Sequence, residues 1–175
     1  MNKNPKVLII YTGGTIGMIN NPKTGALTAF KFDNLYKSIP ELAQFSYELE
    51  VVSVDNPVDS SEINVSNWGE IANTVFDKYE NYDGFVILHG TDTMAFTASA
   101  LSFMLQGLKK PVILTGSQLP IGKIRTDGKE NLITAIEIAG LKDETGAALV
   151  QEVAIYFEYS LFRGNRSSKV SANHF

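Results

Sequence analysis

The sequence contains no cysteine, and this absence excludes several kinds of chemistry at once. Without thiols, the 175-residue chain cannot form disulfides, bind zinc through thiolates, hold a cysteine-ligated iron–sulfur cluster or use a cysteine nucleophile. The absence is compatible with a reducing compartment, but secreted chains can lack cysteine as well.

Histidine is also scarce, and basic residues are outnumbered by acidic ones. Because His89 and His174 are the two histidines of the chain, the sequence gives little support to serine–histidine catalysis or to a histidine-based metal site. No EF-hand loop stands out either, so we expect no metal. The formal net charge is −4, whereas nucleic-acid-binding domains usually carry an excess of basic residues. We therefore expect no nucleic-acid partner.

Long apolar runs are missing too. No stretch approaches the roughly 20 apolar residues that cross a bilayer, so we expect no membrane partner. The N-terminal residues lead directly into a strand-like segment without a separate cleavage site, which predicts that there is no signal peptide.

The overall composition is typical of a globular protein, with 44% hydrophobic and 19% charged residues. Short apolar runs rich in β-branched residues predict five strands covered on both faces, over residues 7–11, 49–54, 85–88, 112–115 and 153–157. Apolar stripes at helical spacing predict helices over 68–79, 94–105 and 132–139, and a weaker one over 33–45, interrupted by Pro40. Strands that alternate with helices predict an α/β fold, an open doubly wound, Rossmann-like and mostly parallel sheet with helices on both faces.

Local signals predict how the helices begin and where the loops lie. Ser66 has the position of an N-cap, and Asp127 with Glu130 has the spacing of a capping box. Residues 12–30 hold four glycines and Pro22, which predicts a long loop after the first strand. Residues 158–175 are polar and show no further element.

Small, hydroxylic or charged residues follow every predicted strand. In an open parallel sheet, ligands bind beyond the carboxyl ends of the strands, and sheet formation by itself does not require polar residues there. These segments are residues 12–17, 55–62, 89–93, 115–118 and 163–169. We therefore expect a site where some of these segments meet.

The first of these segments permits two functional interpretations. Its glycines resemble a dinucleotide-binding turn, but Thr12 stands where the first glycine of that fingerprint belongs. The alternative is covalent catalysis by a threonine, which needs a base for its proton and donors for the oxyanion. Lys169 is a candidate base, since a partly buried lysine can accept a proton, and Asp92 could balance its charge. His89, between a strand and a glycine, is predicted to be structural.

The segment Asp59-Ser60-Ser61 also has two interpretations. Its hydroxyl and carboxyl groups could bind the polar ends of a small zwitterion. Clusters of serine and aspartate also favour helix starts on their own, so the segment can equally be a turn.

Two motifs together resemble the bacterial-type L-asparaginase family. Tyr11-Thr12-Gly13-Gly14-Thr15-Ile16-Gly17 resembles its first signature, and Leu88-His89-Gly90-Thr91-Asp92-Thr93-Met94 resembles its second. Residues 114–118 and 164–169 look like further family segments, so the resemblance covers the whole chain. Without a signal peptide, the chain looks like the type I branch, which implies a cytoplasmic location.

The resemblance implies a set of catalytic residues. Thr15 matches the nucleophile that attacks the side-chain amide carbon, with Gly14 and Thr15 in the turn that would supply the oxyanion donors. Thr91 and Asp92 match the second threonine and its acidic neighbour, and Lys169 matches the lysine that assists proton transfer through Thr91. The implied reaction is hydrolysis of L-asparagine to L-aspartate and ammonia through an acyl-enzyme, without cofactor or metal.

The resemblance also implies a substrate site. Asp92 would bind the α-amino group, and Ser60, with Asp59 and Ser61 beside it, would hold the α-carboxylate. The backbone of Ser117 matches a position near the substrate amide. The preference for asparagine or glutamine stays open, because one methylene changes discrimination by only about 1–3 kcal/mol.

Two departures from the family pattern stand out. Many relatives carry a tyrosine in the loop after the first signature, where this chain has Gly25-Ala26-Leu27. Relatives also have a C-terminal domain that completes the site across a subunit interface. We therefore expect residues 1–175 to be an N-terminal α/β domain of a protein that assembles as a homodimer or homotetramer. Whether this domain is active or inactive alone stays open.

Other functions remain as alternatives. A glutamine-hydrolysing amidotransferase subunit shares this domain, usually with extra N-terminal sequence. A small-ligand-binding or regulatory module for amino acids could use the same fold, because a fold does not determine function. A pure binding site, however, has no need for the combination of Thr15, Thr91, Asp92 and Lys169.

Overall fold

The computed structural model describes residues 4–20, 27–29 and 39–171, and these build a mixed six-stranded sheet in the order β4-β1-β5-β6-β7-β8. The parallel strands are β1 (Lys6–Tyr11), β4 (Glu48–Ser53), β5 (Gly84–Leu88), β6 (Val112–Thr115) and β7 (Val153–Phe157). Each of the five lies within one residue of its predicted range. Strand β8 (Ser160–Arg163) pairs antiparallel with β7.

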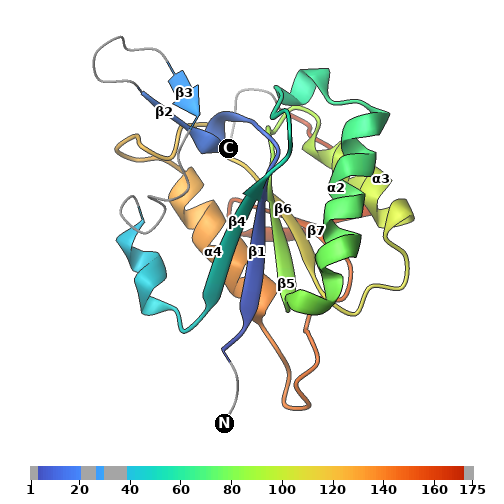
Figure 1. Ribbon diagram of the computed structural model, residues 1–175. Helices are drawn as coiled ribbons and strands as arrows, with labels where there is room; N and C mark the ends of the chain where they lie inside the picture. The colour runs from blue at the N-terminus through green and yellow to red at the C-terminus, as the bar shows by residue number, and fades with distance from the viewer. Residues whose placement is uncertain (1–3, 21–26, 30–38, 172–175) are drawn as a thin grey trace.

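Helices cover both faces of the sheet, as the sequence predicted. Helices α2 (Val65–Lys78) and α3 (Met94–Met104) lie on one side, and α4 (Gly128–Gly140) lies on the other (Figure 1). Strand β1 shows the consequence for its side chains: Leu8 and Ile10 join the core under α2 and α3, whereas Val7 and Ile9 join the core under α4. The α/β, doubly wound architecture is therefore confirmed.

The strand order locates a crevice at one end of the sheet. From β1 the chain moves outward to β4, and it then returns to the other side of β1 as β5. Connections that leave neighbouring strands in opposite directions create a gap above their carboxyl ends, which is where open α/β sheets bind ligands. In this chain the gap lies above β1 and β5, the strands that precede Thr12–Thr15 and His89–Asp92.

Some local predictions were wrong. Strand β4 is not covered on both faces, because it ends the sheet and exposes Glu48, Glu50 and Ser53. Within the predicted loop 12–30 lie the 3-10 helix η1 (Thr15–Gly17) and the antiparallel pair β2 (Met18–Asn20) and β3 (Leu27–Ala29).

The C-terminal segment is also more ordered than its polar sequence predicted. It contains β8 and the 3-10 helix η6 (Gly164–Arg166). Pro40 opens the 3-10 helix η3 (Pro40–Gln44) instead of interrupting a longer helix, since proline suits a first helical position. The rest of that predicted helix, residues 33–38, lies outside the described residues.

Two helix starts differ from their predicted caps. Helix α2 is capped by Asn64, whose side chain accepts a hydrogen bond from the Ser66 backbone, and Asn67 completes a capping box. Asp127 precedes α4, but its carboxylate accepts hydrogen bonds from the backbone N–H groups of Gln118 and Leu119. Asp127 therefore orders the loop after β6 instead of capping its own helix.

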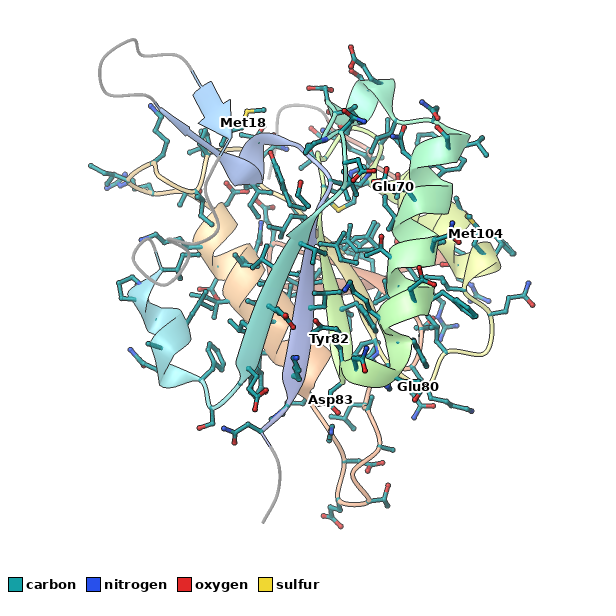
Figure 2. The ribbon with its side chains drawn as sticks, in the orientation of Figure 1. Met18, Glu70, Glu80, Tyr82, Asp83 and Met104 are labelled. Atoms are coloured by element: carbon teal, nitrogen blue, oxygen red, sulfur yellow. The ribbon has the colours of Figure 1, made fainter. Side chains whose placement is uncertain are left out.

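The opposite end of the sheet is held by charged side chains. Figure 2 shows Tyr82 and Asp83 there, far from Met18, which follows the glycine turn. Tyr82 donates a hydrogen bond to Glu50, and burial with this carboxylate raises the pKa of Tyr82 to about 12. Asp83 pairs with Lys142 at 2.7 Å.

Among the described helices, none is long and apolar enough to cross a membrane.

Candidate active site

The glycine turn after β1 lies directly against the loop after β5. Thr12 joins the two strands, because both its backbone N–H and its hydroxyl donate to the Leu88 carbonyl, at 3.1 and 2.9 Å. Gly14 has a φ of 84°, and a Cβ at this position would overlap the backbone of Gly90. The close approach therefore requires glycine at position 14. It places Thr15 and Thr91 each one residue from the point of contact.

Ser60 approaches the same peptide from the segment after β4. A Cβ on Gly90 would lie 2.5 Å from Ser60 Oγ, and the Thr93 hydroxyl donates to the Ser60 carbonyl at 2.6 Å. Ser60 is 3% exposed, as the first residue of the 3-10 helix η4 (Ser60–Glu62). Three segments that are distant in the sequence thus meet at Gly90.

Asp59 and Ser61 differ from Ser60 in that they bond to each other. The Asp59 carboxylate accepts hydrogen bonds from the Ser61 backbone at 2.9 Å and from its hydroxyl at 2.7 Å. These bonds lower the pKa of Asp59. Asp59 therefore has the role that the helix-start interpretation predicted, because its carboxylate caps η4.

Lys169 connects the C-terminal segment to the loop after β5. Its Nζ donates to Thr91 Oγ1 at 3.0 Å and to Asp92 Oδ1 at 2.7 Å. The lysine side chain is 23% exposed and the Asp92 side chain 67%, so the pair sits at the rim of the crevice. Because Lys169 Nζ donates to the Thr91 oxygen, the hydroxyl proton of Thr91 points away from it and is available to another acceptor.

A pocket borders this cluster on its apolar side. Its volume is about 530 Å³, and its walls include Met94, Ile155 and Phe162 together with Thr91 and Lys169. Charged residues line it as well, since Glu158 and Arg166 also belong to its walls.

Ser117 lies in the loop after β6 and turns its hydroxyl inward. Its Oγ donates to the Leu119 carbonyl at 2.6 Å, and the residue is 3% exposed. The hydroxyl proton of Ser117 is therefore used within its own loop. The backbone of Ser117, rather than its side chain, can hydrogen-bond to a ligand.

Residues 6–175 match the family model described as "Asparaginase, N-terminal". The chain belongs to the asparaginase family.

Relatives and a solved structure match over almost the whole chain. It is 41% identical to L-asparaginase 1 of Escherichia coli over 170 residues, which cover 97% of this chain and 48% of that protein. It is 40% identical to the mouse 60 kDa lysophospholipase over 196 residues, covering 100% of this chain and 34% of that protein. The crystal structure of L-asparaginase I from Vibrio cholerae superposes with a TM-score of 0.83 at 42% identity, covering 97% of this chain and 49% of that one. The chain therefore spans half or less of the length of these relatives.

One residue that shapes this asparaginase-family site, Asn131, was not a candidate from the sequence, and Asp127 was expected only as a helix cap. Asn131 on α4 is buried; its Nδ2 donates to the Gly116 carbonyl at 3.0 Å, and its Oδ1 accepts from the Glu158 backbone at 3.2 Å. With Asp127, it holds the loops after β6 and β7. One signal was available: Asn131 lies four residues before Ala135, so it is a polar residue on the predicted apolar stripe.

One departure from the family pattern is the missing tyrosine in the loop after the first signature. Gly25 and Ala26, which occupy the place of the family's loop tyrosine, lie outside the described residues. Leu27 begins β3.

Proposed function

We propose that this chain is the N-terminal α/β domain of an amidohydrolase that converts L-asparagine to L-aspartate and ammonia. The observation that carries the proposal is the pair of hydrogen bonds from Lys169 Nζ, at 3.0 Å to Thr91 and 2.7 Å to Asp92. A lysine, a hydroxyl and a carboxylate joined in this way, beside a second threonine in a glycine turn, form a route for protons. A site that only binds a ligand does not need such a route.

In this proposal the substrate lies above the carboxyl ends of β1 and β5. The Asp92 carboxylate binds the α-ammonium group, and the Ser60 segment, whose turn is stabilised by the hydrogen bonds between Asp59 and Ser61, holds the α-carboxylate. The backbone of Ser117 lies beside the side-chain amide. Backbone N–H groups at Gly14 and Thr15 receive the oxyanion, as preorganised backbone donors do in acyl transfer.

The chemistry proceeds through an ester on Thr15. The Thr15 oxygen attacks the amide carbon, and its proton goes to the Thr91 oxygen. For this step Lys169 acts as an unprotonated amine, and the Thr91 hydroxyl turns toward it and transfers its own proton to the amine. The same route returns a proton to the leaving nitrogen, which departs as ammonia. Water then cleaves the ester to L-aspartate and restores the Thr15 hydroxyl.

The test is ammonia release from L-asparagine and L-glutamine, measured on the 175-residue chain and on the product of the complete gene. We expect Thr15→Ala and Lys169→Met each to lower kcat at least about 100-fold in the active form, with folding retained. Lys123→Met, which changes an exposed lysine outside the cluster, should leave kcat unchanged.

Three outcomes distinguish the candidates. Ammonia from asparagine that is lost in Thr15→Ala supports the proposal. A preference for glutamine favours the amidotransferase-subunit alternative. A folded complete protein that binds asparagine but releases no ammonia overturns the proposal in favour of a binding or regulatory module.

Assembly as a homodimer or homotetramer and a cytoplasmic location belong to the same proposal. Light scattering on the complete protein tests the first. Fractionation of the source cells tests the second.

A further inference from the structure

We propose that Trp68, Thr97 and His89 form a buried chain of hydrogen bonds that positions the Gly90 peptide, and through it Thr91 relative to Thr15 and Ser60. The three are positioning residues, because they act through the backbone and do not touch the reacting atoms. The kinetic consequence of this inference rests on the proposed function. The geometry of the hydrogen bonds does not.

The chain of bonds crosses three elements. Trp68 of α2 donates from Nε1 to the hydroxyl oxygen of Thr97 on α3, at 3.0 Å. The same hydroxyl lies 2.9 Å from Nε2 of His89, which follows β5. The other ring nitrogen, Nδ1, lies 2.6 Å from the carbonyl oxygen of Gly90. Both His89 and Thr97 are 0% exposed, so water does not compete for these bonds.

The chemistry of the partners determines the direction of every bond. A carbonyl can only accept, so His89 must carry its proton on Nδ1 and donate to Gly90. Nε2 of this neutral ring then accepts from the Thr97 hydroxyl, whose oxygen accepts from the indole N–H of Trp68. Among the described residues, no buried side-chain nitrogen or oxygen lacks a partner. Each donor in the chain is used once, and only one tautomer satisfies them all.

Gly90 is the residue at which an error of position would matter most. Its backbone touches the glycine turn at Gly14, and it faces Ser60 on another side. Thr91 and Asp92 follow it directly and are held on the far side by Lys169. A rotation of the Gly90 peptide would therefore change the separation of Thr15, Ser60 and Thr91 together.

A role for His89 as a general acid or base does not fit these contacts. Both ring nitrogens are occupied by groups that do not react, and the ring is fully buried. Burial also lowers the pKa of His89, which keeps the ring neutral. Its function in the site is therefore geometric.

The first test reads the tautomer directly and needs no enzyme activity. Nitrogen-15 NMR of the histidine rings in the 175-residue chain should show His89 protonated at Nδ1, and assignment is simple because His174 is the other histidine. A ring protonated at Nε2, or at both nitrogens near neutral pH, would overturn the proposal whether or not the protein is an asparaginase.

The second test measures kcat and KM for asparagine in the complete protein. Thr97→Val keeps the shape of the side chain but removes the hydroxyl at the centre of the series of hydrogen bonds. We expect kcat to fall about 10-fold or more, with a smaller change in KM. Thr97→Ser keeps the hydroxyl and should restore most of kcat. Trp68→Phe removes only the outermost donor and should have an intermediate effect. Thr74→Val, a matched change of a threonine on α2, should leave kcat unaltered.

The kinetic outcomes separate the two proposals. If the wild-type protein releases no ammonia, the proposed function fails while the tautomer result still stands. If the wild-type protein is active and Thr97→Val matches Thr74→Val in kcat, the positioning role is wrong. Should Thr97→Val fail to fold, Trp68→Phe decides instead, and wild-type kcat in that variant contradicts the proposal.

Discussion

At the scale of the residue, Gly90 determines how closely the site can assemble. A side chain there would collide with Ser60, and a side chain at Gly14 would collide with Gly90 itself. The absence of these two side chains lets the backbones of two signature motifs touch. Lys169 then adds a charged side chain that reaches Thr91 and Asp92 from a segment 78 and 77 residues away.

His89 makes stability depend on pH. Burial lowers the pKa of His89 in the folded protein below its ordinary value of 6.5, so the unfolded chain binds the proton more readily. The contribution of the neutral ring is therefore complete above about pH 7 and is lost as the pH falls below 6.5. Its immediate partners, Thr97 and the Gly90 carbonyl, do not titrate in this range.

Urea denaturation between pH 7.5 and 5.5 provides the measurement. We expect the free energy of unfolding of the wild-type chain to decrease with a slope that approaches about 1.4 kcal/mol per pH unit, the limit for one proton. In His89→Gln this slope should largely disappear, although that variant is less stable at every pH. Equal slopes in the two proteins would contradict a buried, neutral His89.

At the scale of the element, the first turn of α4 organises loops that are not its own. Asp127 accepts from the backbone of Gln118 and Leu119, and Asn131 bonds to Gly116 and Glu158. Helix starts usually direct their polar side chains to their own unpaired N–H groups. Here they support the loops after β6 and β7, at the carboxyl edge of the sheet where the candidate site lies.

Replacement of Asn131 by leucine tests this function of α4. The change leaves the buried Gly116 carbonyl and the partly buried Glu158 N–H without their partner. An unsatisfied buried group costs about 1–3 kcal/mol, and a partly exposed one costs less because water can reach it. We expect the free energy of unfolding to decrease by about 2–4 kcal/mol in urea denaturation. Asn73→Leu, an exposed position on α2, is the matched control and should change stability little. Equal stabilities for the two variants would show that the Asn131 bonds contribute nothing net.

At the scale of the whole molecule, the sheet combines a buried centre with two different edges. Strands β1, β5 and β6 have neighbours on both sides, and their side chains are buried on both faces. Strand β4 ends the sheet on one side and is half exposed, and the antiparallel β8 ends it on the other. Local openings are least costly where few apolar contacts are lost.

Hydrogen exchange in the 175-residue chain measures this gradient. We expect the amides of β1, β5 and β6 to exchange slowest, at rates set by global unfolding, and those of β4 and β8 to exchange at least about 10-fold faster. The amides of β7, which lie between β6 and the edge strand, serve as an internal reference. Protection of β4 equal to that of β5 would contradict the gradient.

The sequence alone determined the elements and the segments that carry the chemistry. Apolar β-branched runs and helical stripes are local patterns, so the five parallel strands were placed within one residue. The three main helices overlap their predicted ranges, although α2 and α4 begin before the predicted stripes. The two signature motifs likewise identified Thr15, Thr91 and Asp92 as candidates, because a motif is read within one stretch of chain.

Tertiary structure alone decided how these pieces meet. The order of the strands, the edge position of β4, the pairing of β8 and the contact of Lys169 with Thr91 all join residues distant in the sequence. The same is true of Asp127, whose spacing fitted a capping box but whose carboxylate serves another loop. The partner that a side chain bonds depends on which groups folding brings within hydrogen-bond distance. No local sequence pattern contains that information.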